Sequence, residues 1–245
     1  MSLRKKFTGT GIAIVTPFHA DGKIDWESFT NLIEFWIKGK VEYLVAIGTT
    51  GESATIHGAE KQEVFSFVQN VVAGRVPLVA GIGGGDTNEV LGWFKQFDLT
   101  GYDAILSVSP AYNKPNQEGI FQHYKALDKA TQLPIIMYNV PGRTGQNVSG
   151  ETTIRIANEC KNIFATKEAC GNFDQINYII KNKPVDFMVI SGDDPITLPM
   201  IACGAEGLIS VVANAYPEDY SNMVRLCIAG KFDEGIAQLK KTEEL

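Results

Sequence analysis

Lys167 has the sequence surroundings of a nucleophile. It follows the mostly apolar residues 163–166 and therefore closes a candidate β-strand. A lysine held in a low-dielectric interior has a lowered pKa, and the resulting neutral amine can attack a carbonyl carbon. The alternative is a strand-end lysine that reaches solvent or pairs with Glu168. The position predicts an imine-forming lysine and leaves that alternative open.

Hydroxyl groups follow two other apolar runs. Tyr138 closes one of them, and Thr49 and Thr50 lie in a Gly-Thr-Thr-Gly turn after the other. A phenol can relay protons to a hydroxyl that lies within hydrogen-bond distance. The amide groups of the turn could also hold a carboxylate without a metal. The alternative is an ordinary tight turn in which the threonines satisfy local backbone groups.

Arg143 is a second candidate for binding an anion. It lies in a Pro-Gly-Arg-Thr-Gly loop directly after the candidate strand that carries Tyr138. A guanidinium can donate two parallel hydrogen bonds to one carboxylate. A surface arginine without a ligand is the alternative, and the position of the loop favours the anion-binding interpretation.

The histidines and cysteines do not have the spacing of metal ligands. The three histidines form no HxH or HExxH pair, and the four cysteines form no CxxC pair. Asp193 and Asp194 have no histidine partner in the sequence nearby, and we expect them to cap the helix that follows Gly192. The sequence therefore predicts no metal site.

Short apolar runs and amphipathic segments alternate along the chain, as is typical of βα units on a parallel sheet. Eight such strands with right-handed crossovers close most economically into a (β/α)8 TIM barrel, whose active sites lie at the carboxyl ends of the strands. A doubly wound sheet is less favoured, because no glycine-rich nucleotide turn follows the first strand. The predicted strands are residues 12–16, 43–48, 77–81, 104–107, 135–139, 163–167, 187–191 and 207–211. The predicted helices are residues 26–38, 59–73, 88–99, 118–131, 149–160, 218–229 and 232–245, with Asp25, Thr87 and Ser149 as candidate N-caps.

The composition fits one barrel domain over residues 1–245. The chain is 44% hydrophobic and 20% charged, which is typical of a globular protein with a single sizeable core. The net charge of −6 and the scattered basic residues disfavour a nucleic-acid partner. No apolar stretch reaches the ~20 residues that a membrane helix needs, and the N-terminus lacks a signal-peptide pattern. We therefore expect a soluble, cytoplasmic protein.

Six short motifs occur in order between about Gly11 and Ala215. They are Gly48-Thr-Thr-Gly-Glu52, Tyr112-Asn113, Tyr138-Asn-Val-Pro141, Arg143-Thr-Gly145, Lys167-Glu168 and Ser191-Gly-Asp-Asp194. Together the motifs resemble the pyruvate-dependent class I aldolases, the family of N-acetylneuraminate lyase, and most closely its dihydrodipicolinate synthase branch. Six ordered motifs are far more specific than any one of them.

The resemblance implies a (β/α)8 barrel that condenses pyruvate with L-aspartate 4-semialdehyde on the route to diaminopimelate and lysine. It implies a covalent imine between Lys167 and pyruvate in place of any cofactor. Tyr138, Thr50 and Tyr112 would relay protons, and Tyr112 would reach across the interface of a homodimer or homotetramer. The implied substrate-binding residues are Thr49 and Thr50 for the pyruvate carboxylate, Arg143 for the semialdehyde carboxylate, and Gly192 and Ile209 through their backbone groups.

Arg143 favours the synthase over the alternative, an N-acetylneuraminate lyase or another sugar-acid aldolase that uses the same imine, because that branch generally lacks this arginine. A non-catalytic ligand-binding barrel is a further alternative, which the retained lysine, tyrosine and threonines disfavour.

The chain departs from the family at three places. Gly58, Lys61, Gly85 and Ala111 stand where lysine-inhibited members have two histidines, an asparagine and a tyrosine, and only Glu89 is kept. We therefore expect weak or absent inhibition by lysine. The end at Leu245 predicts that the family's C-terminal helical extension is missing or shortened. Thr166 replaces a more usual aliphatic residue, and nothing in the sequence explains the change.

Overall fold

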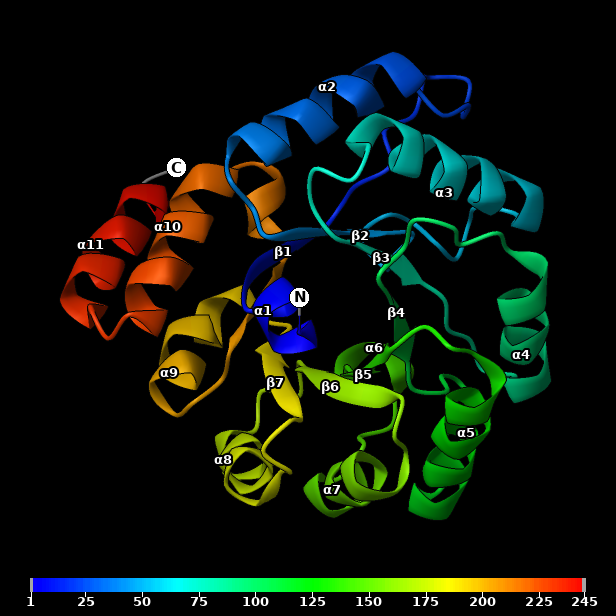
Figure 1. Ribbon diagram of the computed structural model, residues 1–245, viewed down its shortest axis with the longest axis vertical. Helices are drawn as coiled ribbons and strands as arrows, with labels where there is room; N and C mark the ends of the chain where they lie inside the picture. Colours follow the sequence, from blue (N-terminus) through cyan, green and yellow to red (C-terminus); the bar gives the residue numbers. More distant parts are fainter. Residues whose placement is uncertain (1, 244–245) are drawn as a thin grey trace.

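Eight parallel strands close into a barrel in which each strand pairs with its neighbours in sequence and β8 pairs with β1 (Figure 1). The computed structural model describes residues 2–243. The strands are β1 Gly9–Ala13, β2 Tyr43–Ala46, β3 Leu78–Gly81, β4 Ala104–Val108, β5 Ile135–Asn139, β6 Ile163–Glu168, β7 Met188–Ser191 and β8 Gly207–Ser210. The predicted (β/α)8 barrel is confirmed.

The first strand begins earlier than the predicted residues 12–16, because its pairing with β8 starts at a glycine-rich segment. Gly9 pairs with Gly207, and Gly11 pairs with Ile209. A Cβ atom on Gly207 would lie 2.3 Å from the carbonyl oxygen of Gly9, and one on Gly11 would lie 2.1 Å from the ring of Tyr43. Glycine disfavours strands in isolation, but here it allows two close approaches that propensity does not reveal.

A ring of helices surrounds the barrel (Figure 1). The helices that follow the eight strands are α2 Trp26–Lys38, α3 Gly58–Val72, α4 Thr87–Gln96, α5 Gln117–Ala130, α7 Gly150–Glu159, α8 Phe173–Asn182, α9 Thr197–Ala202 and α10 Pro217–Ile228. Shorter elements are α6 Pro141–Thr144 and the 3₁₀ turns η1 Asp194–Ile196 and η2 Val212–Asn214. Helix α11, Phe232–Glu243, packs against α10 and α9. The end of its predicted range lies outside the described residues.

The sequence predicted no range for two helices of the ring, although it indicated a helix after Gly192. Helix α8 has the expected signals, an Asn172 side chain that caps its first turn and the buried residues Ile176 and Ile179 at helical spacing. Helix α9 has only six residues and contains Pro199, so it is too short for a periodic pattern.

Two of the three predicted helix caps are confirmed. The Asp25 side chain accepts a hydrogen bond from Ser28 N at 3.0 Å, and the Ser149 hydroxyl accepts one from Thr152 N at 3.2 Å. The prediction of Thr87 as a cap is wrong, because the cap of α4 is Asp86. The Thr87 hydroxyl instead lies 2.8 Å from Nδ1 of a buried histidine on α5.

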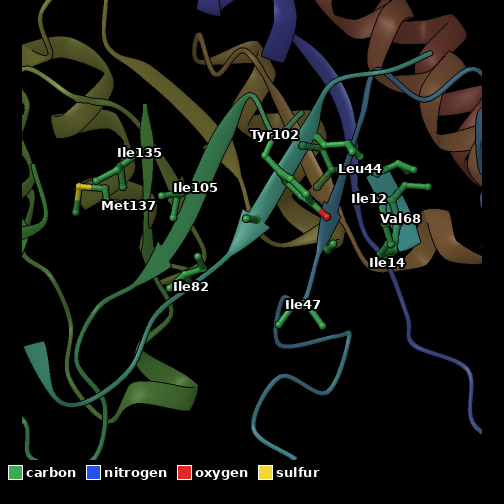
Figure 2. Close-up of a cluster of buried hydrophobic side chains, with 14 of the residues drawn as sticks. Ile12, Ile14, Leu44, Ile47, Val68, Ile82, Tyr102, Ile105, Ile135 and Met137 are labelled. Atoms are coloured by element: carbon green, nitrogen blue, oxygen red, sulfur yellow. The ribbon is translucent and has the colours of Figure 1, made fainter. Parts of the chain in front are cut away.

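Side chains alternate between two apolar layers. The outward-facing side chains of the strands, such as Leu44, Ile105 and Met137, pack with the surrounding helices in an outer cluster (Figure 2). The inward-facing side chains, such as Val45 and Ile136, fill the barrel itself. This filled interior leaves open space for a ligand only at the ends of the barrel.

Helix α1, Leu3–Phe7, closes the end of the barrel where the strands begin, and it lies over the middle of the ring in Figure 1. The ring of Phe7 contacts Tyr43 and Phe164, with centroid distances of 5.2 and 5.3 Å. Arg4 forms an ion pair with Glu206 near the start of β8. Because α1 covers this end, a ligand must enter at the carboxyl ends of the strands.

None of the helices in the described part of the chain is long and apolar enough to cross a membrane.

Candidate active site

A cavity of about 200 Å³ lies at the carboxyl ends of the strands. It is lined by Ala13, Gly48, Thr49, Thr50, Leu106, Tyr138, Val140, Arg143, Lys167, Ala169, Gly192, Asp193 and Val211. Six residues that the sequence singled out therefore meet here, although they come from five different strand ends and loops. Two others, Tyr112 and Ile209, do not line the cavity.

A β-bulge in β6 turns the side chain of Lys167 into the barrel. The register between β5 and β6 shifts between Ile135 and Ile136, so Phe164 becomes an additional residue in β6. Phe164 and Ala165 consequently both belong to the inner cluster, and the alternation beyond them is displaced by one position. Without this bulge, Lys167 would face the surrounding helices.

The amine of Lys167 is buried and has no ion-pair partner among residues 2–243. Only 3% of the residue is exposed, and Nζ lies 4.3 Å from the centroid of the Tyr138 ring. Burial lowers the pKa of Lys167 to about 8, although the carboxylate of Asp194 opposes this shift and Arg143 reinforces it. Desolvation dominates, so a useful fraction of the amine is neutral near physiological pH.

We expect the rate of imine formation to rise with pH up to about 8 and then level off. Below that value the ammonium form predominates, and the neutral nucleophile declines about tenfold for each pH unit. The measurement is the rate of borohydride trapping with pyruvate at pH values between about 6 and about 10. A profile with its midpoint near 10.5, the ordinary lysine value, would contradict this assignment.

Glu168 faces away from Lys167, so the alternative in which these two neighbours form an ion pair is wrong. The Glu168 carboxylate accepts hydrogen bonds from Asn139 Nδ2 at 2.9 Å, from Cys170 N at 2.9 Å and from Gln175 Nε2 at 3.4 Å. Successive residues of a strand point to opposite faces of the sheet, which separates the two charges.

Asn139 and Glu168 lie on the helix-facing side of the sheet and position the side chains of Tyr138 and Lys167. Tyr138 pairs with Lys167 in the β5–β6 register, and Asn139 pairs with Glu168 directly beside them. The amide-to-carboxylate hydrogen bond therefore holds the two strand ends together at the reactive pair. Nothing in the sequence indicated this role, although Asn139 and Glu168 directly follow the candidate residues Tyr138 and Lys167.

Gly192 leaves room for the aliphatic chain of Lys167. A Cβ atom at this position would lie 2.8 Å from Lys167 Cε and 2.9 Å from Cγ. The backbone amide of Gly192 donates to the carbonyl of Glu168 at 2.8 Å, which holds the two strand ends at this distance. Any side chain here would therefore push the lysine from its position.

Gly192→Ala is expected to slow imine formation by about tenfold or more, because a displacement of the reacting atoms by about 1 Å has effects of this order. Pyruvate trapping measures the effect, and the melting temperature shows whether the barrel is still folded. Gly142→Ala is the matched control, because a Cβ atom there would meet nothing within 4 Å. Equal trapping rates for the two variants would contradict the packing argument.

Thr49 and Thr50 lie in a turn that begins with an unusual backbone conformation. The preceding Ile47 has a positive φ of 56°, which is unfavourable for a β-branched residue. Neither threonine hydroxyl forms a hydrogen bond with another of the described residues, so the threonines do not serve the local backbone. Both residues line the cavity, so their hydroxyls are available to a ligand.

Tyr138 contributes a phenol to the same cavity. Burial raises the pKa of Tyr138, Arg143 lowers it, and Asp193 raises it further. The phenol therefore stays protonated and can donate. Its hydroxyl forms no hydrogen bond within the described residues, and the relay to Thr50 stays a prediction.

Arg143 lies on the single turn of α6, and its guanidinium forms no ion pair within residues 2–243. Its backbone amide donates to the carbonyl of Val140 at 2.9 Å, which directs the loop over the cavity. The side chain lines the cavity and is exposed, so it can meet an incoming anion.

Tyr112 is 92% exposed and lies outside the cavity of its own chain. Its φ of 68° places it in the left-handed region, which is unusual for an aromatic residue. Ile209 lies deeper in the barrel, within the inner cluster, and the neighbouring Val211 lines the cavity instead. The role of Ile209 in substrate binding stays a prediction.

The prediction that Asp193 and Asp194 cap the following helix is wrong. Asp193 occupies the N-cap position of η1, but its side chain makes no capping hydrogen bond. The Asp194 carboxylate accepts a hydrogen bond from the Ser210 hydroxyl and another from Val211 N at 3.0 Å. Asp194 therefore joins the ends of β7 and β8, a long-range contact that local spacing does not indicate.

A second cavity of about 520 Å³ adjoins the first and shares Gly48, Thr49, Leu106 and Tyr138 with it. Some positions correspond to those that differ from the lysine-inhibited members of the family or are shared with them. Of these, Gly58, Lys61 and Glu89 line this cavity. The ammonium of Lys61 lies 4.6 Å from the ring centroid of Trp93. Burial lowers the pKa of Lys61, and the nearby Glu89 opposes that shift.

Residues 6–245 match the dihydrodipicolinate synthetase family. The chain is 52% identical over 225 residues to a 4-hydroxy-tetrahydrodipicolinate synthase from Parabacteroides distasonis, covering 92% of this chain and 76% of that one. Dihydrodipicolinate synthase from Thermotoga maritima has a similar structure, with a TM-score of 0.94 at 38% identity over 97% of this chain and 81% of that one. The Acinetobacter baumannii enzyme, solved as a complex with pyruvate, gives a TM-score of 0.92 at 39% identity over 96% and 80% of the two chains. This chain belongs to the dihydrodipicolinate synthetase family.

Proposed function

We propose that Lys167 forms an imine with pyruvate and that the chain thereby condenses pyruvate with L-aspartate 4-semialdehyde. This is the reaction of a 4-hydroxy-tetrahydrodipicolinate synthase, a lyase of the diaminopimelate and lysine route, and it agrees with the name shared by the relatives. The observation that carries the proposal is a buried lysine of lowered pKa beside a phenol and two free hydroxyls in one cavity.

The first half of the reaction activates pyruvate. Neutral Lys167 attacks the ketone carbon, water leaves, and the resulting iminium draws electrons from the adjacent methyl group. Loss of a methyl proton then gives an enamine. Thr49 and Thr50 would bind the pyruvate carboxylate, because both residues line the cavity and their hydroxyls have no other partner among the described residues. The imine itself supplies the electron sink, so we propose that no metal or organic cofactor takes part.

The second half forms the new carbon–carbon bond. The enamine attacks the aldehyde carbon, and Tyr138 donates a proton to the oxygen on which negative charge develops. The ammonium of the adduct loses a proton, and the resulting amine attacks the iminium carbon. Lys167 Nζ takes up a proton, its bond to that carbon breaks, and the ring closes as the lysine is released. Thr50 and Tyr112 would complete the proton relay.

Arg143 provides the test that separates this synthase from a sugar-acid lyase. Arg143→Ala should keep pyruvate trapping on Lys167 but lower condensation by about a hundredfold, because a bidentate contact to a carboxylate is lost. Arg155→Ala, at an exposed ion pair on α7, is the matched control and should change neither. Loss of both activities, or cleavage of N-acetylneuraminate by the unchanged chain, would contradict the assignment.

We also propose a homodimer or homotetramer in which Tyr112 completes the active site of a neighbouring subunit. The exposed side chain and the unusual backbone of Tyr112 support a role outside its own chain. Subunits with Tyr112→Phe, mixed with subunits carrying Lys167→Met, should regain activity, because one hybrid site then has both groups. Failure of the mixture to exceed either variant alone would contradict the exchange.

Lysine at millimolar concentration is expected to inhibit the activity weakly or not at all. Lys61 already occupies the space beside Trp93 and Glu89, so a second ammonium would meet a like charge and no free aromatic face. Steady-state assays with added lysine measure this. The melting temperature should also stay constant, because a ligand that binds the native state would raise it.

A further inference from the structure

Three carboxylates, those of Glu168, Asp193 and Asp194, lie at the ends of β6 and β7, and two of them already accept hydrogen bonds. Glu168 faces the helices and accepts several N–H donors, and Asp194 accepts from Ser210 and the amide of Val211. The carboxylate of Asp193 is different. It forms no hydrogen bond or ion pair with any group that the structure describes, although Asp193 lines the cavity.

The free carboxylate of Asp193 stands within a definite charge pattern. Asp193 and Arg143 both line the cavity, and both act electrostatically on the phenol of Tyr138, in opposite directions. Burial and the neighbouring Asp194 raise the pKa of Asp193, so both disfavour its charged form. A cation bound in the cavity would stabilise that charged form.

The acceptor substrate carries such a cation. L-aspartate 4-semialdehyde has an ammonium and a carboxylate on the same carbon atom, so it presents two opposite charges to the cavity. We infer that Asp193 binds the ammonium of the semialdehyde while Arg143 binds its carboxylate, and that this pair selects an α-amino aldehyde over one without the amino group. This inference rests on the proposed function.

The location of Asp193 also suits ring closure. Its neighbour Gly192 packs directly against Lys167, since a Cβ atom there would lie 2.8 Å from Cε. Because Asp193 directly follows Gly192, an ammonium bound by Asp193 would lie on the side of the cavity that holds the imine, and it can attack the imine carbon once it has lost a proton. Asp193 thus orients the substrate for the later step as well as recognising it.

Succinate semialdehyde is the probe, because it has the same aldehyde and carboxylate but lacks the ammonium. Asp193→Asn should raise the KM for aspartate semialdehyde by about ten- to a hundredfold, the effect of losing a hydrogen bond to a charged group. The inhibition constant of succinate semialdehyde against the same substrate should change by less than about twofold. Pyruvate trapping on Lys167 should be unchanged.

Asp186→Asn is the matched control. Asp186 is exposed and lies just before the start of β7, whereas Asp193 follows the end of that strand. Asp186→Asn therefore removes the same negative charge outside the cavity. An equal effect of Asp193→Asn on both semialdehydes, or an effect on neither, would overturn the assignment, and so would a loss of pyruvate trapping. Absence of trapping or condensation in the unchanged chain would instead refute the proposed function, and the role of Asp193 with it.

Discussion

Lys167→Met is expected to abolish condensation, with kcat falling by on the order of 10⁴-fold or more, as for other essential nucleophiles. Methionine keeps an unbranched chain of similar length in the buried position. Borohydride treatment with pyruvate should add no mass to the variant. The barrel should fold, since the change removes an amine that burial disfavours.

The same variant should be more stable than the unchanged chain at pH 7, by about 3 kcal/mol. Folding lowers the pKa of Lys167 from 10.5 to about 8, so the unfolded chain binds more protons between these values. The stability of the unchanged chain therefore rises as the pH passes from 8 towards 10.5, and the advantage of the variant shrinks over that window. Urea unfolding at several pH values measures it.

Lys181→Met is the control for both measurements. Lys181 is exposed on α8, so its replacement should change neither trapping nor the pH dependence of stability. Borohydride-dependent mass on another lysine of the Lys167→Met variant would show that the nucleophile had been assigned wrongly.

Tyr138→Phe is expected to lower kcat for condensation by about 10²- to 10⁴-fold, the usual contribution of a positioned acid or base. Phenylalanine keeps the ring that lies 4.3 Å from Lys167 Nζ and removes only the hydroxyl. Pyruvate binding should therefore persist, and the loss should fall on the steps that transfer protons. Single-turnover measurements of imine formation and condensation separate these steps.

Tyr102→Phe is the matched control, because it removes another buried tyrosine hydroxyl far from the cavity. Tyr102 donates to the carbonyl of Phe65 at 3.1 Å, so this variant should lose about 1 kcal/mol of stability and no activity. A Tyr138→Phe enzyme that retained condensation within a few-fold of the unchanged chain would remove the phenol from the mechanism.

Much of the barrel could be predicted because its signals are local. Strands β4, β5 and β6 begin where the apolar runs begin, at Ala104, Ile135 and Ile163. The helix from Trp26 to Lys38 has its predicted bounds, since a capping aspartate and a glycine mark its ends. Helix α1 was missed because five residues carry too little periodicity, although Phe7 is fully buried once the barrel forms.

Most of the candidate site could be predicted for a related reason. In a parallel barrel all strands end at the same rim, so the residues that follow the apolar runs must meet there. Thr50, Tyr138, Arg143 and Lys167 were selected on this basis, and they line one cavity. Ile209 was expected to line it as well, but it lies in the inner cluster.

The sequence by itself determined the residue types, their order and the strand ends that carry them, because hydrophobic periodicity and turn composition are properties of neighbouring residues. Only the tertiary structure decided which way the side chains face. The bulge at Phe164 turns Lys167 into the barrel, and bonds from β8 occupy Asp194 but leave Asp193 free. Both outcomes depend on pairing between residues far apart in the chain, and such pairing leaves no local pattern.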